Sequence, residues 1–180
     1  MASITHPGLF LKQRTGVTLR SNLAISTVGV NIGANSFRAH PFMVTQRLNL
    51  DRIGFEITGV GGAGAGCYVG LYTDNGNFYP ATLIVDGGTF DCSAVGGVGI
   101  KLANVNVVLE PGLYWLAFLC NDAAITFTGP ENSRQLRMKD SDNSMVWSVA
   151  QAYGALPNPY PGGAGNDNGP IPYYRIASYS

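Results

Sequence analysis

Apolar and polar residues alternate over short stretches along most of the chain, as they do in half-buried β-strands. The stretch 48–57 changes phase at Asp51-Arg52, which predicts a β-bulge or a change of strand there. The stretch 67–73 alternates as well, and Asn75-Gly76 close behind it is a strong signal for a tight turn. Short strands separated by turn residues predict an all-β fold, an antiparallel β-sandwich of the jelly-roll kind.

One stretch, LYWLAFLC from Leu113 to Cys120, is apolar on both of its faces. It therefore predicts a strand in the middle of a sheet that is covered on both sides. The stretch 97–109 predicts another strand, and we assign its buried face to Val98, Ile100 and Leu102. Further strand-like stretches are 82–88, 89–93, 124–129, 145–150 and 173–179, whereas 133–140 is ambiguous.

The two ends of the sequence differ in organisation. Residues 1–40 carry scattered apolar positions without a periodic face, so we expect an extended N-terminal arm. Residues 41–180 then form a single β-sandwich domain, which needs no metal or disulfide to support its core at this size. Within this domain the segment 155–170 is rich in Pro and Gly and predicts a long loop.

Charges are few and unevenly placed. Charged residues make up 12% of the chain, hydrophobic residues make up 46%, and the formal net charge is zero, which indicates surfaces that partners cover. All eleven acidic residues lie from Asp51 onward, so the arm is purely basic. This favours an arm that docks on an acidic neighbour, although chance in a weakly charged chain explains it equally well. The residues that we assign to this contact are Leu9, Phe10, Leu11, Lys12, Arg14 and Arg20.

Several partners and compartments are disfavoured by the same composition. Nucleic acid is not expected as a partner, because phosphate binding needs a dense cationic stripe. The uncharged run of residues 57–73 is broken by six glycines, so no membrane span is expected there, and the N-terminus shows no export signal. The three cysteines, Cys67, Cys92 and Cys120, lack C-x-x-C spacing and predict small core residues rather than a zinc site or a disulfide framework.

Catalytic motifs are weak throughout. Residues 59–64 match G-x-G-x-x-G, but a strand follows instead of the helix that a dinucleotide site needs. His6 and His40 are the only histidines, and no nucleophile motif accompanies them. Residues 140–144 resemble the start of a calcium loop, but Met145 stands where Gly is required, so a polar hairpin tip is expected. We therefore expect no enzyme activity, cofactor or metal, although paired carboxylates for glycoside hydrolysis remain an open alternative.

A set of aromatic residues lies in or beside the turn-rich segments. Such rings suit a subunit interface or a surface on which sugars stack, and ordinary packing within the domain is the equal alternative. The set comprises Tyr79, Trp147, Tyr153, Tyr160, Tyr173 and Tyr174.

Four segments carry a resemblance to a known class of domain. They are RAHPFMVTQRLNLDRIGFEIT, VGLYTDNGNFYPATLIVDGGTF, VVLEPGLYWLAFLC and ALPNPYP, and together they cover about residues 36–162. In this order they resemble a β-sandwich domain of tailed-phage virion proteins, found in tail fibres and in capsid decoration or fibre proteins. The resemblance implies a homotrimeric structural protein and no catalytic residue.

These expectations combine into one leading hypothesis. The chain would be a capsid decoration or cement-type protein, located in the virion, assembled in the host bacterial cytoplasm and bound to the major capsid protein or other virion proteins. A tail fibre or receptor-binding tip is the first alternative. A carbohydrate-binding module or glycan-degrading enzyme is the second, so a glycan ligand stays open.

Overall fold

The computed structural model describes residues 15–20, 27–130, 146–166 and 169–179. Every regular element in these ranges is a β-strand. These ranges contain no helix that is long and apolar enough to cross a membrane. The strands are β1 (Thr18–Arg20), β2 (Thr27–Val30), β3 (Ser36–Val44), β4 (Leu48–Gly59), β5 (Gly66–Asp74), β6 (Pro80–Asp91), β7 (Gly99–Leu109), β8 (Gly112–Cys120), β9 (Thr126–Pro130), β10 (Val146–Ala150), β11 (Ala164–Asn166) and β12 (Tyr173–Tyr179).

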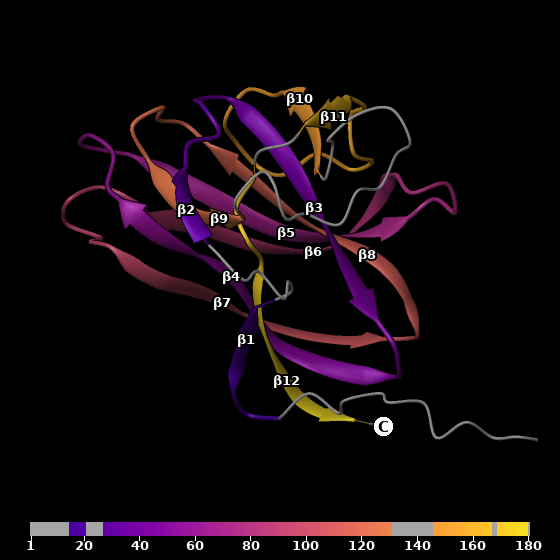
Figure 1. The fold of residues 1–180 in the computed structure, drawn as a ribbon. Coiled ribbons are helices and arrows are strands. Elements are labelled where there is room, and N and C mark those ends of the chain that lie inside the picture. The colour runs from indigo at the N-terminus through magenta and orange to yellow at the C-terminus, as the bar shows by residue number, and fades with distance from the viewer. Residues whose placement is uncertain (1–14, 21–26, 131–145, 167–168, 180) are drawn as a thin grey trace, which may run out of the picture.

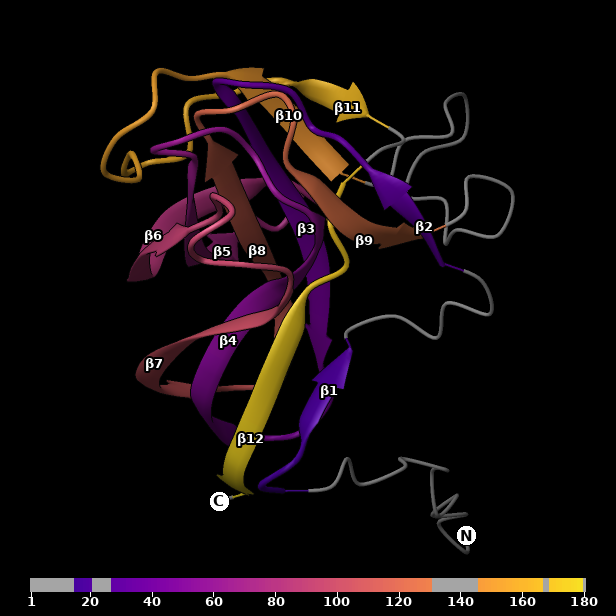
Figure 2. The same cartoon turned by 90° about the vertical axis from the view of Figure 1, so that its left-hand side faces the viewer.

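The strands form two antiparallel sheets that pack face to face (Figure 1). Sheet A has the order β1-β12-β4-β9-β2, and β7 pairs with the other side of β4. Sheet B has the order β11-β10-β3-β8-β5-β6. Figure 2 shows β12 running between β1 and β4, so the two ends of the described chain meet in sheet A. The predicted all-β sandwich is confirmed.

The inner faces of the two sheets enclose the main hydrophobic core. Phe55 on β4 lies at its centre and makes edge-on ring contacts with Phe90, Phe118 and Phe127, at centroid distances of 5.3–5.7 Å. Such edge-to-face pairs stabilise a core beyond their buried area. Because these rings come from four different strands, the cluster ties sheet A to sheet B.

The predicted phase slip in β4 is confirmed. Leu48 and Leu50 are buried before the slip, and Ile53 and Phe55 are buried after it. The register between β4 and β7 shifts between Leu50 and Arg52, which is the bulge that keeps both sets of side chains on the core face.

The predicted turn at Asn75-Gly76 is confirmed as the connection between β5 and β6. Gly76 has a φ of 88°, which glycine adopts without strain. Its N–H donates to the Asp74 carboxylate over 2.7 Å. The turn therefore closes through the short polar side chain that precedes it.

A second hydrophobic layer covers the outer face of sheet B. Residues 151–163, which we call the cap segment, run across this face without regular structure. Leu156 and Tyr160 of the cap segment pack with Phe37, Tyr72 and Trp115. Strand β8 is thus covered on both faces, as its apolar sequence predicts. The predicted 155–170 loop packs on sheet B through Leu156 and Tyr160 and contains β11.

The prediction of an extended arm over residues 1–40 is wrong for its second half. The backbone of β1 pairs with β12, β2 pairs with β9, and β3 begins at Ser36, so the expected boundary at residue 40 falls inside a strand. Val30 and Ile32 are buried in the main core. Val28, Val30 and Ile32 alternate with Gly29 and Asn31, which is a short strand pattern that the arm interpretation left out.

The assigned buried face of the 97–109 stretch is also wrong. Val98 and Ile100 are 63% and 49% exposed, whereas Ala103, Val107 and Leu109 are buried. Apolar residues occupy both faces of this strand, and its pairing with β4 turns the odd-numbered positions to the core, opposite to the assigned set.

Candidate interaction surfaces

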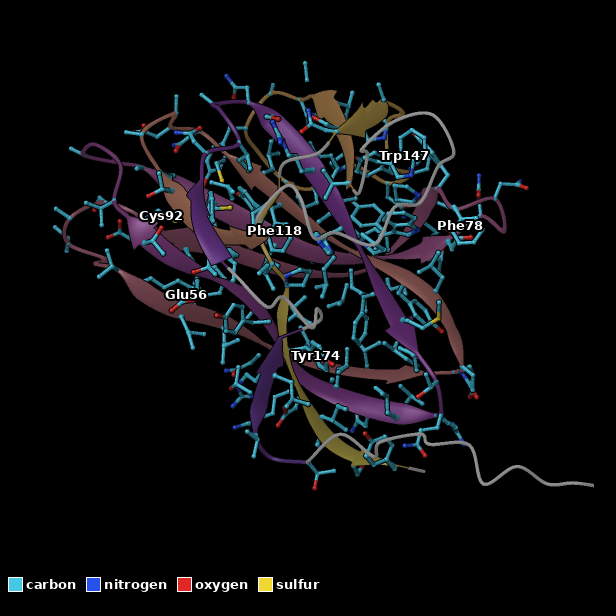
Figure 3. The ribbon with its side chains drawn as sticks, in the orientation of Figure 1. Glu56, Phe78, Cys92, Phe118, Trp147 and Tyr174 are labelled. Atoms are coloured by element: carbon cyan, nitrogen blue, oxygen red, sulfur yellow. The ribbon has the colours of Figure 1, made fainter. Side chains whose placement is uncertain are left out.

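Three aromatic residues lie where the β5–β6 turn meets β10. The Tyr79 and Trp147 rings lie with centroids 4.6 Å apart at an angle of 60°. The indole Nε1–H of Trp147 donates to the backbone carbonyl of Phe78 over 2.6 Å. Figure 3 shows Phe78 and Trp147 on the same side of the molecule. We call Phe78, Tyr79 and Trp147 the aromatic surface.

Phe78 is the unusual member of the aromatic surface. Its φ is 58°, in the left-handed region that bulky residues rarely adopt, and the residue is 56% exposed. The turn fixes this conformation, because the Asn75 side chain accepts the Asn77 N–H over 2.8 Å and the Asn75 N–H donates to the Tyr79 carbonyl over 2.9 Å. A strained residue that presents an apolar ring to solvent is a candidate for binding.

The surroundings of the aromatic surface are polar but weakly charged. Asn75 and Asn77 are exposed beside it. Asp74 contributes a carboxylate that is already engaged, since it accepts the Trp115 indole N–H over 2.8 Å. Burial raises the pKa of the Tyr79 hydroxyl, so that this ring stays neutral. Rings flanked by amides suit a neutral polar ligand such as a sugar.

Of the other four aromatic residues predicted for an interface, three are buried and one is half-buried. Tyr160, Tyr173 and Tyr174 are buried within the chain, so their assignment to a surface is wrong. The Tyr160 hydroxyl lies 3.1 Å from the Phe37 carbonyl and 3.2 Å from the Trp147 carbonyl, which makes it a support for the aromatic surface. Tyr153 is half-buried, and its hydroxyl lies 2.7 Å from the Thr89 hydroxyl.

Most of the predicted arm contact lies outside the described residues. This holds for Leu9, Phe10, Leu11, Lys12 and Arg14. Arg20 is the last residue of β1, and its backbone pairs with Tyr173 of β12. Arg20 therefore belongs to sheet A by its backbone rather than to a free arm.

A second candidate surface is the edge of sheet A at β7. Among the described strands β7 pairs only with β4, so its other side presents backbone N–H and C=O groups. The outward face carries Ile100, Asn104, Asn106 and Val108, all exposed and uncharged. Lys101, the one charged residue of β7, donates to the Gly96 carbonyl of its own chain. We call this strand with its outward face the β7 edge.

The described residues offer no group of three or more His, Cys, Asp or Glu side chains that could hold a metal ion. The predicted polar hairpin at residues 140–144 lies outside them. Glu56 accepts the hydroxyls of Thr128 and Tyr173 over 2.6 and 2.5 Å on sheet A. These contacts link β4 to β9 and β12, which is a structural role for this carboxylate.

His40 is also placed as a core residue. It lies on β3 and is buried, with Nδ1 3.1 Å from the Pro41 carbonyl. Burial lowers the pKa of the imidazole from 6.5 to about 4, so His40 is neutral at neutral pH.

No family model matches the chain, and no curated protein matches it either. The class that the fold itself defines is an antiparallel β-sandwich with two apolar layers.

Proposed function

We propose that this chain is a non-enzymatic structural protein of a phage particle, a capsid decoration protein that assembles as a homotrimer. The observation that carries this proposal is the β7 edge. It is eleven residues long and lacks an outward charge, the device by which edge strands commonly avoid pairing with other chains. A strand of this kind suits a permanent contact between subunits.

The resemblance noted in the sequence supports the same proposal. Its four segments correspond to β3 with β4, β5 with β6, the end of β7 with β8, and the centre of the cap segment. They supply most of sheet B and its covering layer, so the resemblance extends over a continuous structural unit. The low charge of the whole chain fits a protein whose surface is covered by neighbours.

The trimer contact is tested by placing charge on the β7 edge. We expect the double variant Ile100→Lys with Val108→Lys to sediment as a monomer, because lysines on an edge face oppose strand and face pairing. Met43→Lys is the matched control, since Met43 is 59% exposed on β3, which belongs to sheet B and does not pair with β7. A wild-type chain that sediments as a monomer at micromolar concentration, or a double variant that remains trimeric, contradicts the proposal.

Location in the particle is tested by electron microscopy of virions that contain the chain. A decoration protein appears over the head in many copies, whereas a tail fibre appears at the tail in few. Density for this chain only at the tail would replace the decoration proposal by the tail-fibre alternative.

A second candidate function rests on the aromatic surface, where Phe78 and Trp147 could stack on a receptor glycan. Phe78→Gly removes the ring and also relieves the left-handed backbone, so we expect the variant to be at least as stable as the wild type. A glycan-array signal that this variant loses supports a receptor-binding role. Absence of any signal for the wild type rejects it, and release of reducing sugar from bound glycans would instead indicate an enzyme.

A further inference from the structure

Two of the three cysteines lie opposite each other on neighbouring central strands. Cys67 of β5 pairs directly with Cys120 of β8, and their Sγ atoms are 2.8 Å apart. Both side chains are fully buried in the main core. The sequence separation of 53 residues hides this juxtaposition from any spacing motif.

The type of strand pair determines whether these two sulfurs can bond. In the adjacent pair, the Asn121 N–H donates to the Gly66 carbonyl over 3.2 Å, which marks a hydrogen-bonded position. The next pair in an antiparallel ladder, Cys67 with Cys120, is then non-hydrogen-bonded, with Cα atoms about 4.5 Å apart in the usual geometry. This separation lies within the range of roughly 4.4–6.8 Å found for disulfides.

We propose that Cys67 and Cys120 form a cross-strand disulfide when the chain folds in the presence of a small-molecule disulfide such as oxidised glutathione. One cysteine thiolate attacks the glutathione disulfide, forms a mixed disulfide and releases one glutathione thiolate. The other cysteine thiolate then displaces the second glutathione. The protein loses two hydrogen atoms in total, and oxidised glutathione becomes two molecules of reduced glutathione.

Cys92 is the third thiol of the core and remains reduced. It follows the end of β6, and its Sγ lies 3.5 Å from the Phe90 carbonyl. The residue opposite Cys67 on β6 is Phe90, so Cys92 has no directly opposed cysteine. Figure 3 marks its position near one end of the sandwich.

Burial determines when the disulfide forms. It raises the pKa of the Cys67 thiol well above its ordinary value and that of Cys92 to about 12, so the reactive thiolate is scarce in the folded protein. The exchange therefore belongs to the folding chain, while the core is still open. Once folded, the same burial protects the bond from reduction.

The test compares the full chain produced in bacteria with an oxidising cytoplasm and in bacteria with a reducing one. After denaturation and labelling with a maleimide, we expect one free thiol in the first sample and three in the second. Peptide mapping without reductant should join the Cys67 peptide to the Cys120 peptide. The oxidised protein should melt roughly 5–15 °C higher, because the cross-link closes a long loop.

Three variants give the controls. Cys67→Ala and Cys120→Ala should each keep two free thiols in the oxidising host and show no rise in Tm. Cys92→Ala, an equally buried position, should have no free thiol and keep the rise. Serine variants replace any alanine variant that does not fold. Three free thiols in the folded wild type from the oxidising host, or a link that involves Cys92, overturn the proposal.

Discussion

Trp115 is the largest of the fully buried side chains and lies in the layer between sheet B and the cap segment. We expect Trp115→Ala to lower the free energy of unfolding by about 3–5 kcal/mol, because the variant loses transfer energy and leaves a cavity. Urea denaturation followed by circular dichroism measures this. Trp147→Ala is the comparison, since Trp147 is only half-buried and should cost clearly less. If both variants lose the same free energy of unfolding, the cap segment contributes little to stability.

His40 makes stability depend on pH. Its pKa is about 4 in the folded chain and 6.5 without the fold, so the unfolded chain binds the extra proton between these values. Stability from this residue is therefore complete above about pH 6.5 and falls as the pH drops towards 4, by about 3 kcal/mol in all. Denaturation of the wild type and of His40→Leu at several pH values measures the difference. A wild type that loses no more stability than the variant in this window contradicts the assignment.

At the scale of single strands, the sequence predicted which face is buried for those strands in which only one face is apolar. The β4 bulge and the buried alternation of Cys67, Val69 and Leu71 in β5 could be derived, because each leaves one consistent face for the core. The buried face of β7 could not be derived, because this strand has apolar residues on both faces and only the pairing with β4 selects one of them.

The candidate surfaces were predicted only in part, for similar reasons. Tyr79 and Trp147 were found as aromatics near turns, and Phe78 was missed because nothing in the sequence marks a left-handed phenylalanine. Tyr173 and Tyr174 belong to one strand with both rings buried, so proximity to a turn was a poor guide to exposure. The β7 edge depends on which strands end each sheet, which is a property of topology rather than of local pattern.

The cap segment depends on a glycine in the strand beneath it. A Cβ atom at Gly70 of β5 would collide with the Leu156 side chain, so the missing side chain leaves room for this residue. We expect Gly70→Val to displace the cap segment and to cost about 1–3 kcal/mol. Limited proteolysis should then cleave within residues 151–163 faster than in the wild type. Gly154→Ala is the control, because its Cβ meets no atom within 4 Å, and equal cleavage in both variants would count against a tight cap.

At the scale of the whole molecule, the N-terminal region divides into a part outside the described residues and a part built into sheet A. Deleting residues 1–14 should leave Tm within a few degrees and abolish attachment to particles that lack the protein. Deleting residues 1–35 should lower Tm by roughly 10 °C, because it removes the buried Val30 and Ile32.

Calorimetry and rebinding to depleted particles measure the two effects separately. Binding through Lys12 and Arg14 should also weaken as salt is added, since exposed charges are screened. If the shorter deletion rebinds as well as the full chain, attachment runs through the sandwich and the arm has no part in it.

The position of β12 between β1 and β4 has a consequence for biosynthesis. A ribosome delivers β4 more than a hundred residues before Tyr173, so during that interval one side of β4 has backbone groups without their final partner. β-sheets built from such distant pairings form slowly, and open edges invite association between nascent chains. A chaperone that shields β4 during translation would therefore raise the yield of soluble protein more than faster translation would.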